Sequence, residues 1–140
     1  MESIKKLLKD DGYSLVVGYL DEAFMYRGRG ISDLMQILAD TKNNLLKDAY
    51  VGDKVVGKAA AALMIQGGIK AVYAELISQS ALKLFASAAP SIKVSYDKKV
   101  EYIANRTQTG WCPMELACKD AKTPEECLAR IKEKMAEMKN

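Results

Sequence analysis

The residues best suited to chemistry in this chain lie around one cysteine. Cys112 precedes Pro113, and Glu115 follows three residues after the cysteine. Proline fits the first turn of a helix, so Cys112 should lie at the positive end of a helix dipole, which favours a thiolate. Glu115 can bond back to the backbone N–H of Cys112 as in a capping box, although its charge opposes thiolate formation. Cys112 and Glu115 are therefore candidate catalytic residues, and the alternative is a structural helix start under Trp111.

A second candidate is a polar stretch shortly before that cysteine. Asn105 and Arg106 stand there, followed by Thr107, Thr109 and Gly110. The guanidinium of Arg106 offers a rigid, bidentate fork for a phosphate or carboxylate group. We therefore expect Asn105 and Arg106 to bind an anionic group, and the alternative is a polar surface loop.

Four further residues near two expected helix starts are candidate ligand-binding residues. Lys58 lies on an otherwise apolar, alanine-rich helix, and with Asp53 it would mark a pocket for a phosphate or carboxylate. Ser78 and Ser80 lie at the start of the next helix, where backbone N–H groups bind anions. The alternatives are an N-cap at Asp53 with a lysine that reaches solvent, and simple capping by the two serines.

The composition limits the chemistry further. The chain has 140 residues, three cysteines, no histidine and a net charge of +3. Without histidine, Ser-His-Asp and Cys-His catalysis and histidine-bearing zinc sites are excluded. Three cysteines without a C-x-x-C pair are typical of reduced thiols in a cytoplasmic protein. The mild, interleaved charge argues against nucleic acid as the main partner, and no apolar run reaches the roughly 20 residues that span a bilayer.

The apolar pattern predicts alternating helices and strands. The expected helices are an N-terminal one that ends at Gly12, one capped by Ser32 or Asp33, one from Asp53 to a stop at Gly67-Gly68, one between Ser78 and Pro90, and two after Pro113. The expected strands cover residues 13–20, 23–26, 69–77, 92–96 and 100–103. Residues 97–99 are too few for a crossover, so the last two strands should be antiparallel.

These elements indicate a sheet covered by helices on both faces. We expect a single α/β domain over residues 1–140, with three α/β/α layers and a mixed sheet of about five strands. Cys118 and Cys127 fall within helices and should be core residues. Cys112 should leave the sheet at the edge opposite Ser78, so one pocket would hold both only if the intervening loop folds back or a second subunit contributes. Exposed edge strands would also allow a homo-oligomer.

This order of elements resembles the cytidine deaminase fold, including the branch whose last two strands are antiparallel. The resemblance lies in the initial helix and hairpin, DKVVGKAAAAL, AVYAELIS, SALKLF and the closing strand pair. The strings DKVVGKAAA, ELISQSAL, NRTQTG and CPMEL are similar to a small bacterial and archaeal family, a domain of unknown function with a deaminase-like fold. The resemblance covers nearly the whole chain and implies a fold without an established activity.

The zinc residues of that fold have no counterpart in this chain. Zinc deaminases carry H-x-E or C-x-E on the first buried helix and P-C-x-x-C at the start of the next, and these ligands hold a zinc ion that activates water. Here the corresponding stretches are VGKA (56–59) and ISQSA (77–81), which contain no thiol, imidazole or carboxylate. The resemblance therefore implies that hydrolytic zinc deamination is lost, that no metal or cofactor is bound, and that Ser78 and Ser80 face a ligand.

Three functions fit these observations. The first is a metal-free protein of deaminase-like fold that binds a small anionic or nucleotide-like ligand through Lys58, Ser78 and Arg106. The second is a thiol-dependent enzyme or redox-responsive protein that uses Cys112, with the helix dipole or a nearby cation in place of histidine. The third is a non-catalytic protein-interaction module, since a fold does not determine a function.

Overall fold

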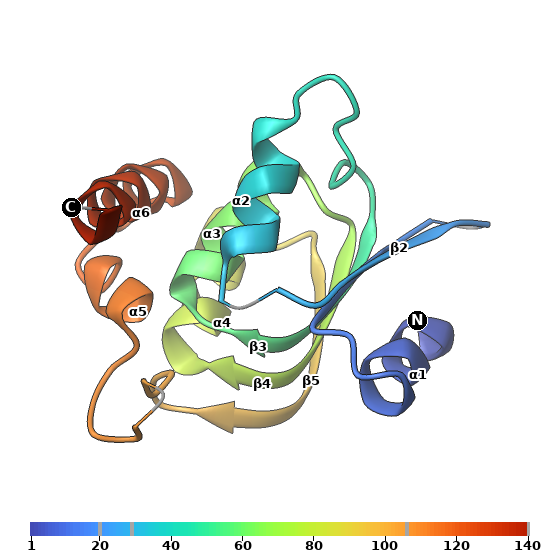
Figure 1. Cartoon of the computed structure of the whole chain (residues 1–140), viewed down its shortest axis with the longest axis horizontal. Coiled ribbons are helices and arrows are strands. Elements are labelled where there is room, and N and C mark those ends of the chain that lie inside the picture. Colours follow the sequence, from blue (N-terminus) through green and yellow to red (C-terminus); the bar gives the residue numbers. More distant parts are fainter. Residues whose placement is uncertain (20, 29, 106, 140) are drawn as a thin grey trace.

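The computed structural model describes residues 1–19, 21–28, 30–105 and 107–139, which form six helices and one five-stranded sheet (Figure 1). The helices are α1 (Glu2–Asp10), α2 (Ser32–Ala39), α3 (Lys58–Gly67), α4 (Gln79–Ala88), α5 (Pro113–Ala117) and α6 (Pro124–Lys139). The strands are β1 (Leu15–Gly18), β2 (Ala23–Tyr26), β3 (Tyr50–Val56), β4 (Ala71–Ser78) and β5 (Lys93–Val100). None of these helices combines the length and the apolar character needed to cross a membrane.

The sheet is mixed, in the order β2-β1-β3-β4-β5. The strand β1 is antiparallel to both β2 and β3, whereas β3, β4 and β5 are parallel to one another. Parallel neighbours require a crossover, and α3 and α4 provide the two crossovers. The carboxyl ends of β3, β4 and β5 therefore meet at one edge of the sheet, where α3 and α4 begin.

Helices α2, α3 and α4 cover one face of the sheet, and α1 covers part of the other face (Figure 1). Successive strand residues point to opposite faces. Leu15 and Val17 accordingly pack under α2 to α4, whereas Val16 packs with Ile4 and Leu8 of α1. The sheet thus separates a large core from a small one.

Local sequence signals account for several element boundaries. The alanine-rich α3 is buried almost throughout and ends at Gly68, whose φ of 80° is the left-handed conformation predicted for a helix stop. Ser78 caps α4 as predicted, because its Oγ accepts a hydrogen bond from the N–H of Ala81 at 3.1 Å. Cys118 and Cys127 are fully buried, which confirms their expected place in the core.

The predicted helix start at Asp53 is wrong, because residues 50–56 form strand β3. This stretch is rich in β-branched residues and pairs with β1 on one side and β4 on the other. Gly57 is still extended, with φ −94° and ψ −176°, so α3 begins only at Lys58. Asp53 is therefore a strand residue and not an N-cap.

The predicted antiparallel pair at the end of the sheet is also wrong. Residues 93–100 form the single strand β5, parallel to β4, and beyond it the described chain makes only an isolated bridge between Ala104 and Trp111. The polar residues read as a turn lie on an edge strand that is exposed along most of its length. Asp97 is used there as an acceptor for the Tyr73 hydroxyl at 2.5 Å and for the Lys9 ammonium at 2.7 Å.

Candidate functional site

A buried polar junction lies at the carboxyl ends of the parallel strands. We define this junction by Lys58 and Ser80 at the starts of α3 and α4, Ser78 at the end of β4, Ile103 after β5, and Glu115 of α5. Open α/β sheets bind their ligands at this edge. Because β5 is parallel to β4, the chain after it returns to this edge and brings the segment around Cys112 beside Ser78, contrary to the prediction that they lie at opposite edges.

The carboxylate of Glu115 occupies the centre of the junction. Its side chain is only 2% exposed. Oε1 accepts hydrogen bonds from the N–H of Lys58 at 2.7 Å and from the hydroxyl of Ser80 at 3.0 Å, and Oε2 accepts one from the N–H of Ile103 at 3.0 Å. A buried carboxylate is stable only when donors surround it in this way. The N–H of Lys58 at the start of α3 and the hydroxyl of Ser80 at the start of α4 are thus occupied by the chain's own carboxylate.

The predicted capping box between Glu115 and Cys112 does not form. The N–H of Cys112 donates instead to the carbonyl of Ile103 at 2.8 Å, and Glu115 points toward α3. The helix that Cys112 precedes has five residues, so its dipole is weaker than the prediction assumed. Glu115 is therefore a residue that joins α3, α4 and the chain after β5, and the described donors to its carboxylate come from these segments.

The side chain of Lys58 has a structural partner. Its ammonium donates to the carbonyl of Lys119 at 3.2 Å and to that of Ala121, both in the link between α5 and α6. No ion pair joins Lys58 to Asp53 among the residues that the structure describes. The buried amine thus fastens this link to α3, and the pocket predicted for Asp53 with Lys58 does not form as a pair.

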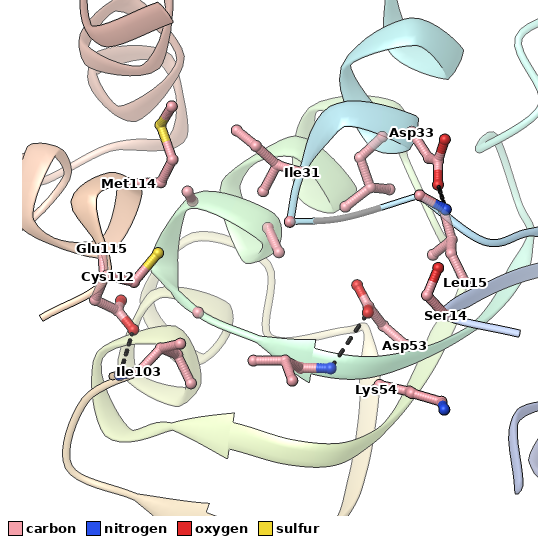
Figure 2. A pocket seen from close by; sticks show the side chains of 17 residues that line it. Ser14, Leu15, Ile31, Asp33, Asp53, Lys54, Ile103, Cys112, Met114 and Glu115 are labelled. Carbon is pink, nitrogen blue, oxygen red and sulfur yellow. Dashed lines mark hydrogen bonds between the residues drawn. The ribbon is translucent and has the colours of Figure 1, made fainter. Parts of the chain in front are cut away.

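A cavity of about 150 Å³ lies beside the junction, between β3, α2 and α5 (Figure 2). We call it the Asp53 cavity. Its walls are mostly apolar and include Leu15, Ile31, Leu34 and Met114. Its charged lining residues are Asp33, Asp53, Lys54 and Glu115, and Cys112 also lines it, whereas Lys58, Ser78 and Ser80 do not. The cavity therefore lies next to the predicted serines and lysine and includes three of the predicted site residues.

Asp53 is the most unusual group in this cavity. Its side chain is 8% exposed, and Oδ1 accepts a long hydrogen bond of 3.3 Å from the N–H of Val55. Burial raises the pKa of Asp53 well above its usual range, and the nearby charge of Asp33 adds to this, while backbone N–H groups of Lys54 and Val55 partly oppose it. Within the described chain, no side chain donates to this carboxyl group. Asp53 is thus available to a molecule in the cavity.

Asp33 lies on the rim of the same cavity and has a local role. Its Oδ2 accepts a hydrogen bond from the N–H of Gly28 at 2.8 Å, which closes the turn before α2. A Cβ atom at Gly28 would collide with this carboxylate, so a larger residue there would force the side chain of Asp33 to move. The N-cap position of α2 is occupied by Ile31, so neither Ser32 nor Asp33 stands at the N-cap that the sequence predicted for one of them.

Cys112 faces the cavity from the side opposite Asp53 (Figure 2). Its side chain is half-buried, and its thiol is free, as are those of Cys118 and Cys127. The last two are fully buried elsewhere in the core, so Cys112 is the thiol with access to a ligand in the cavity.

The predicted anion site after residue 103 is only partly within the described chain. Asn105 organises its own loop, because its Oδ1 accepts from the N–H of Thr109 at 3.0 Å and its Nδ2 donates to the Thr109 hydroxyl at 3.2 Å. This geometry supports the alternative of a polar loop for Asn105. Arg106 lies outside the described residues.

Two features of the site were not predicted from the sequence. The donors to Glu115 come from three distant segments, and no local pattern indicates them. The cavity position of Asp53 follows from its strand, since Asp53 is two residues after the core residue Val51 and points to the same face of the sheet. An acid at a core-facing strand position is rare without a partner or a function. Among the residues described, no three His, Cys, Asp or Glu side chains are grouped as metal ligands.

Comparisons with known proteins agree on the fold. The sequence model of the TM1506 family, a domain of unknown function (DUF1893), matches residues 3–135. The crystal structure of a DUF1893 family protein (TM1506) from Thermotoga maritima is similar, with a TM-score of 0.84 and 27% sequence identity, over 95% of this chain and 88% of that chain. No curated protein matches the chain significantly.

Proposed function

The chain belongs to the DUF1893 family, whose function is unknown, and from its site we propose that it binds a small molecule in the Asp53 cavity. The observation that carries this proposal is the carboxyl group of Asp53, which is buried, faces the cavity and receives no hydrogen bond from any described side chain. A concave, apolar site with a few convergent polar groups is the usual form of a ligand site.

The volume of the cavity limits the size of the ligand group that it can enclose. A volume of about 150 Å³ corresponds to a single six-membered ring, since an apolar cavity of that order holds benzene. A nucleotide-like ligand would therefore place its base inside and leave its sugar and phosphate outside. The anionic part of the predicted ligand gains no support from Lys58 and Ser80, because the Lys58 N–H and the Ser80 hydroxyl donate to Glu115.

A ligand screen tests this proposal. Thermal unfolding of the full chain should shift upward with at least one member of a panel of nucleosides, nucleotides and ring-sized amines, alcohols and acids. The shift should be lost in Asp53→Asn and retained in Asp10→Asn, which changes an exposed acid on α1. A panel that leaves the wild-type unfolding temperature unchanged would count against the proposal.

We further propose that the fold is a metal-free variant of the cytidine deaminase-like fold. The support is that α3 and α4 begin side by side at the edge where zinc deaminases hold their ion, and that Glu115 bonds there to the N–H of Lys58 and the hydroxyl of Ser80. Metal analysis of protein refolded with excess zinc should find no stoichiometric ion. One zinc per chain would refute this variant.

A thiol-dependent activity is the second candidate, because Cys112 lines the same cavity. Its alkylation rate, measured against pH by mass spectrometry, should exceed those of the buried Cys118 and Cys127. Slow reaction of Cys112, with the pKa of an ordinary thiol near 8.5, would eliminate this candidate. A non-catalytic interaction role and a homo-oligomer stay predictions, and light scattering of the purified chain tests the second.

A further inference from the structure

We propose that the group bound in the Asp53 cavity is a small organic cation, an alkyl or arylalkyl ammonium, whose nitrogen donates to the carboxylate of Asp53. This inference rests on the proposed function and names the class of ligand. It requires a ligand nitrogen to reach the free side of the carboxyl group, apolar atoms to fill the remaining space, and a net deficit of positive charge around the cavity. Each requirement corresponds to a described feature of the site.

The free side of the carboxyl group is the first feature. Oδ1 of Asp53 has one long backbone bond of 3.3 Å, and Oδ2 has no hydrogen-bond partner among the described side chains. Glu115 is a buried carboxylate with a structural role, and donors from three segments lie 2.7 to 3.0 Å from its oxygens. Asp53 lacks such donors although it is almost as deeply buried. Its missing donor can come from a ligand.

The charge around the cavity is the second feature. Among the lining residues that the structure describes, three carry carboxyl groups, Asp33, Asp53 and Glu115, and one, the half-buried Lys54, carries an ammonium. Backbone N–H groups of Gly28 and Ile103 reach Asp33 and Glu115. A buried carboxylate without a counter-charge is strongly disfavoured, so a cationic ligand gains where an anionic one is repelled.

The shape of the cavity is the third feature. About 150 Å³ with walls that include Leu15, Ile31 and Leu34 accommodates a ring or a short alkyl chain. An amine on such a body places its apolar atoms against these side chains and its nitrogen at Asp53. Among the described residues no three His, Cys, Asp or Glu side chains come together as metal ligands, so the cavity favours an organic cation over an inorganic one.

Three probes of one shape test the inference: benzylamine, benzyl alcohol and benzoate, titrated into the isotopically labelled full chain and followed by NMR. We expect all measurable shifts to centre on residues of the cavity. Benzylamine should bind about tenfold or more tightly than benzyl alcohol, the range given by a charge-assisted hydrogen bond, and benzoate should bind most weakly. In Asp53→Asn this preference should vanish while benzyl alcohol still binds, and Asp10→Asn should behave as wild type.

Each other outcome identifies which proposal fails. Equal affinity for benzylamine and benzyl alcohol, or an amine preference that survives Asp53→Asn, would overturn the cation while small-molecule binding in the cavity stands. Shifts confined to residues away from the cavity, or no saturable shift with any probe, would overturn both proposals. Circular dichroism of each variant shows whether it is folded, so a failure of folding is not read as a failure of binding.

Discussion

Replacing Glu115 tests the claim that its carboxylate joins the parallel edge of the sheet to the chain that follows it. The informative change is Glu115→Gln, which preserves the shape of the side chain and removes its charge. Oε1 of glutamine can still accept from the N–H of Lys58 and the hydroxyl of Ser80. Its amide nitrogen, a donor, then faces the N–H of Ile103, which in the wild type donates to a carboxylate oxygen at 3.0 Å.

The expected loss follows from these bonds. The N–H of Ile103 is left without its partner, which costs about 1–3 kcal/mol, and the remaining bonds lose their charge assistance. We therefore expect Glu115→Gln to lower the free energy of unfolding by about 2–3 kcal/mol. Glu115→Ala removes every acceptor, leaves the donors of Lys58, Ser80 and Ile103 unpaired at about 1–3 kcal/mol for each buried one, and should lower it by about 3–5 kcal/mol.

Urea unfolding at 25 °C, followed by circular dichroism, measures both losses. With a slope of about 1–3 kcal/mol/M, the midpoint of Glu115→Gln should fall by about 1 M or more. The control is Glu101→Gln, which changes an exposed acid after β5 and should stay within about 0.5 kcal/mol of wild type. If Glu115→Gln unfolds with the midpoint of this control, the carboxylate does not join these segments and the reasoning is wrong.

Three further changes test neighbouring parts of the structure. Burial raises the pKa of Asp53, so folding favours its acid form. The stability of the wild type relative to Asp53→Asn should therefore fall as the pH rises from about 3.9, the pKa of an exposed aspartate, through the raised pKa of the folded state. Urea unfolding at pH 5 and pH 9 should show this fall, and a pH-independent difference would contradict it. Gly57→Ala would place a Cβ atom 2.8 Å from Oε2 of Glu115 and should lower the free energy of unfolding by about 1–3 kcal/mol, measured by thermal unfolding. An unchanged stability would mean that the side chains of the junction move to accommodate the methyl group. Tyr73→Phe removes the hydrogen bond from the Tyr73 hydroxyl to Asp97 and should lower the free energy of unfolding by about 1–2 kcal/mol, measured in the same way. An unchanged free energy of unfolding would mean that this bond does not stabilise the fold.

The elements that the sequence predicted correctly are those with local signals. The stop of α3 at Gly68 follows from backbone freedom, and the cap at Ser78 follows from the hydroxyl that reaches the N–H of Ala81. Strands β3 and β5 were predicted wrongly because pairing with neighbouring strands, and not the local sequence, determines their structure. Asp53 resembles a helix cap in sequence and Asp97 resembles a turn, yet each lies within a strand whose parallel neighbour, β4, is 18 or more residues away.

The same limit applies to the site. Residue types alone singled out Asp53, Cys112 and Glu115, and all three line the cavity. Their partners were not predictable, because Lys58 and Glu115 are 57 residues apart and meet only after β5 joins the sheet in the parallel direction. With the wrong direction for β5, the sequence placed Cys112 at the far edge, and the error in one strand became an error in the site.

Asp53 and Glu115 are both buried at this edge, and the contrast between them is the strongest argument for function. Folding explains Glu115, because its donors hold three segments together. Folding does not explain Asp53, whose burial opposes ionisation and whose carboxyl group is met only by the backbone N–H groups of Lys54 and Val55 among the described residues. A position that conflicts with stability and gains little compensation is where a functional requirement is expected, and we propose that this requirement acts in the cavity that Asp53 faces.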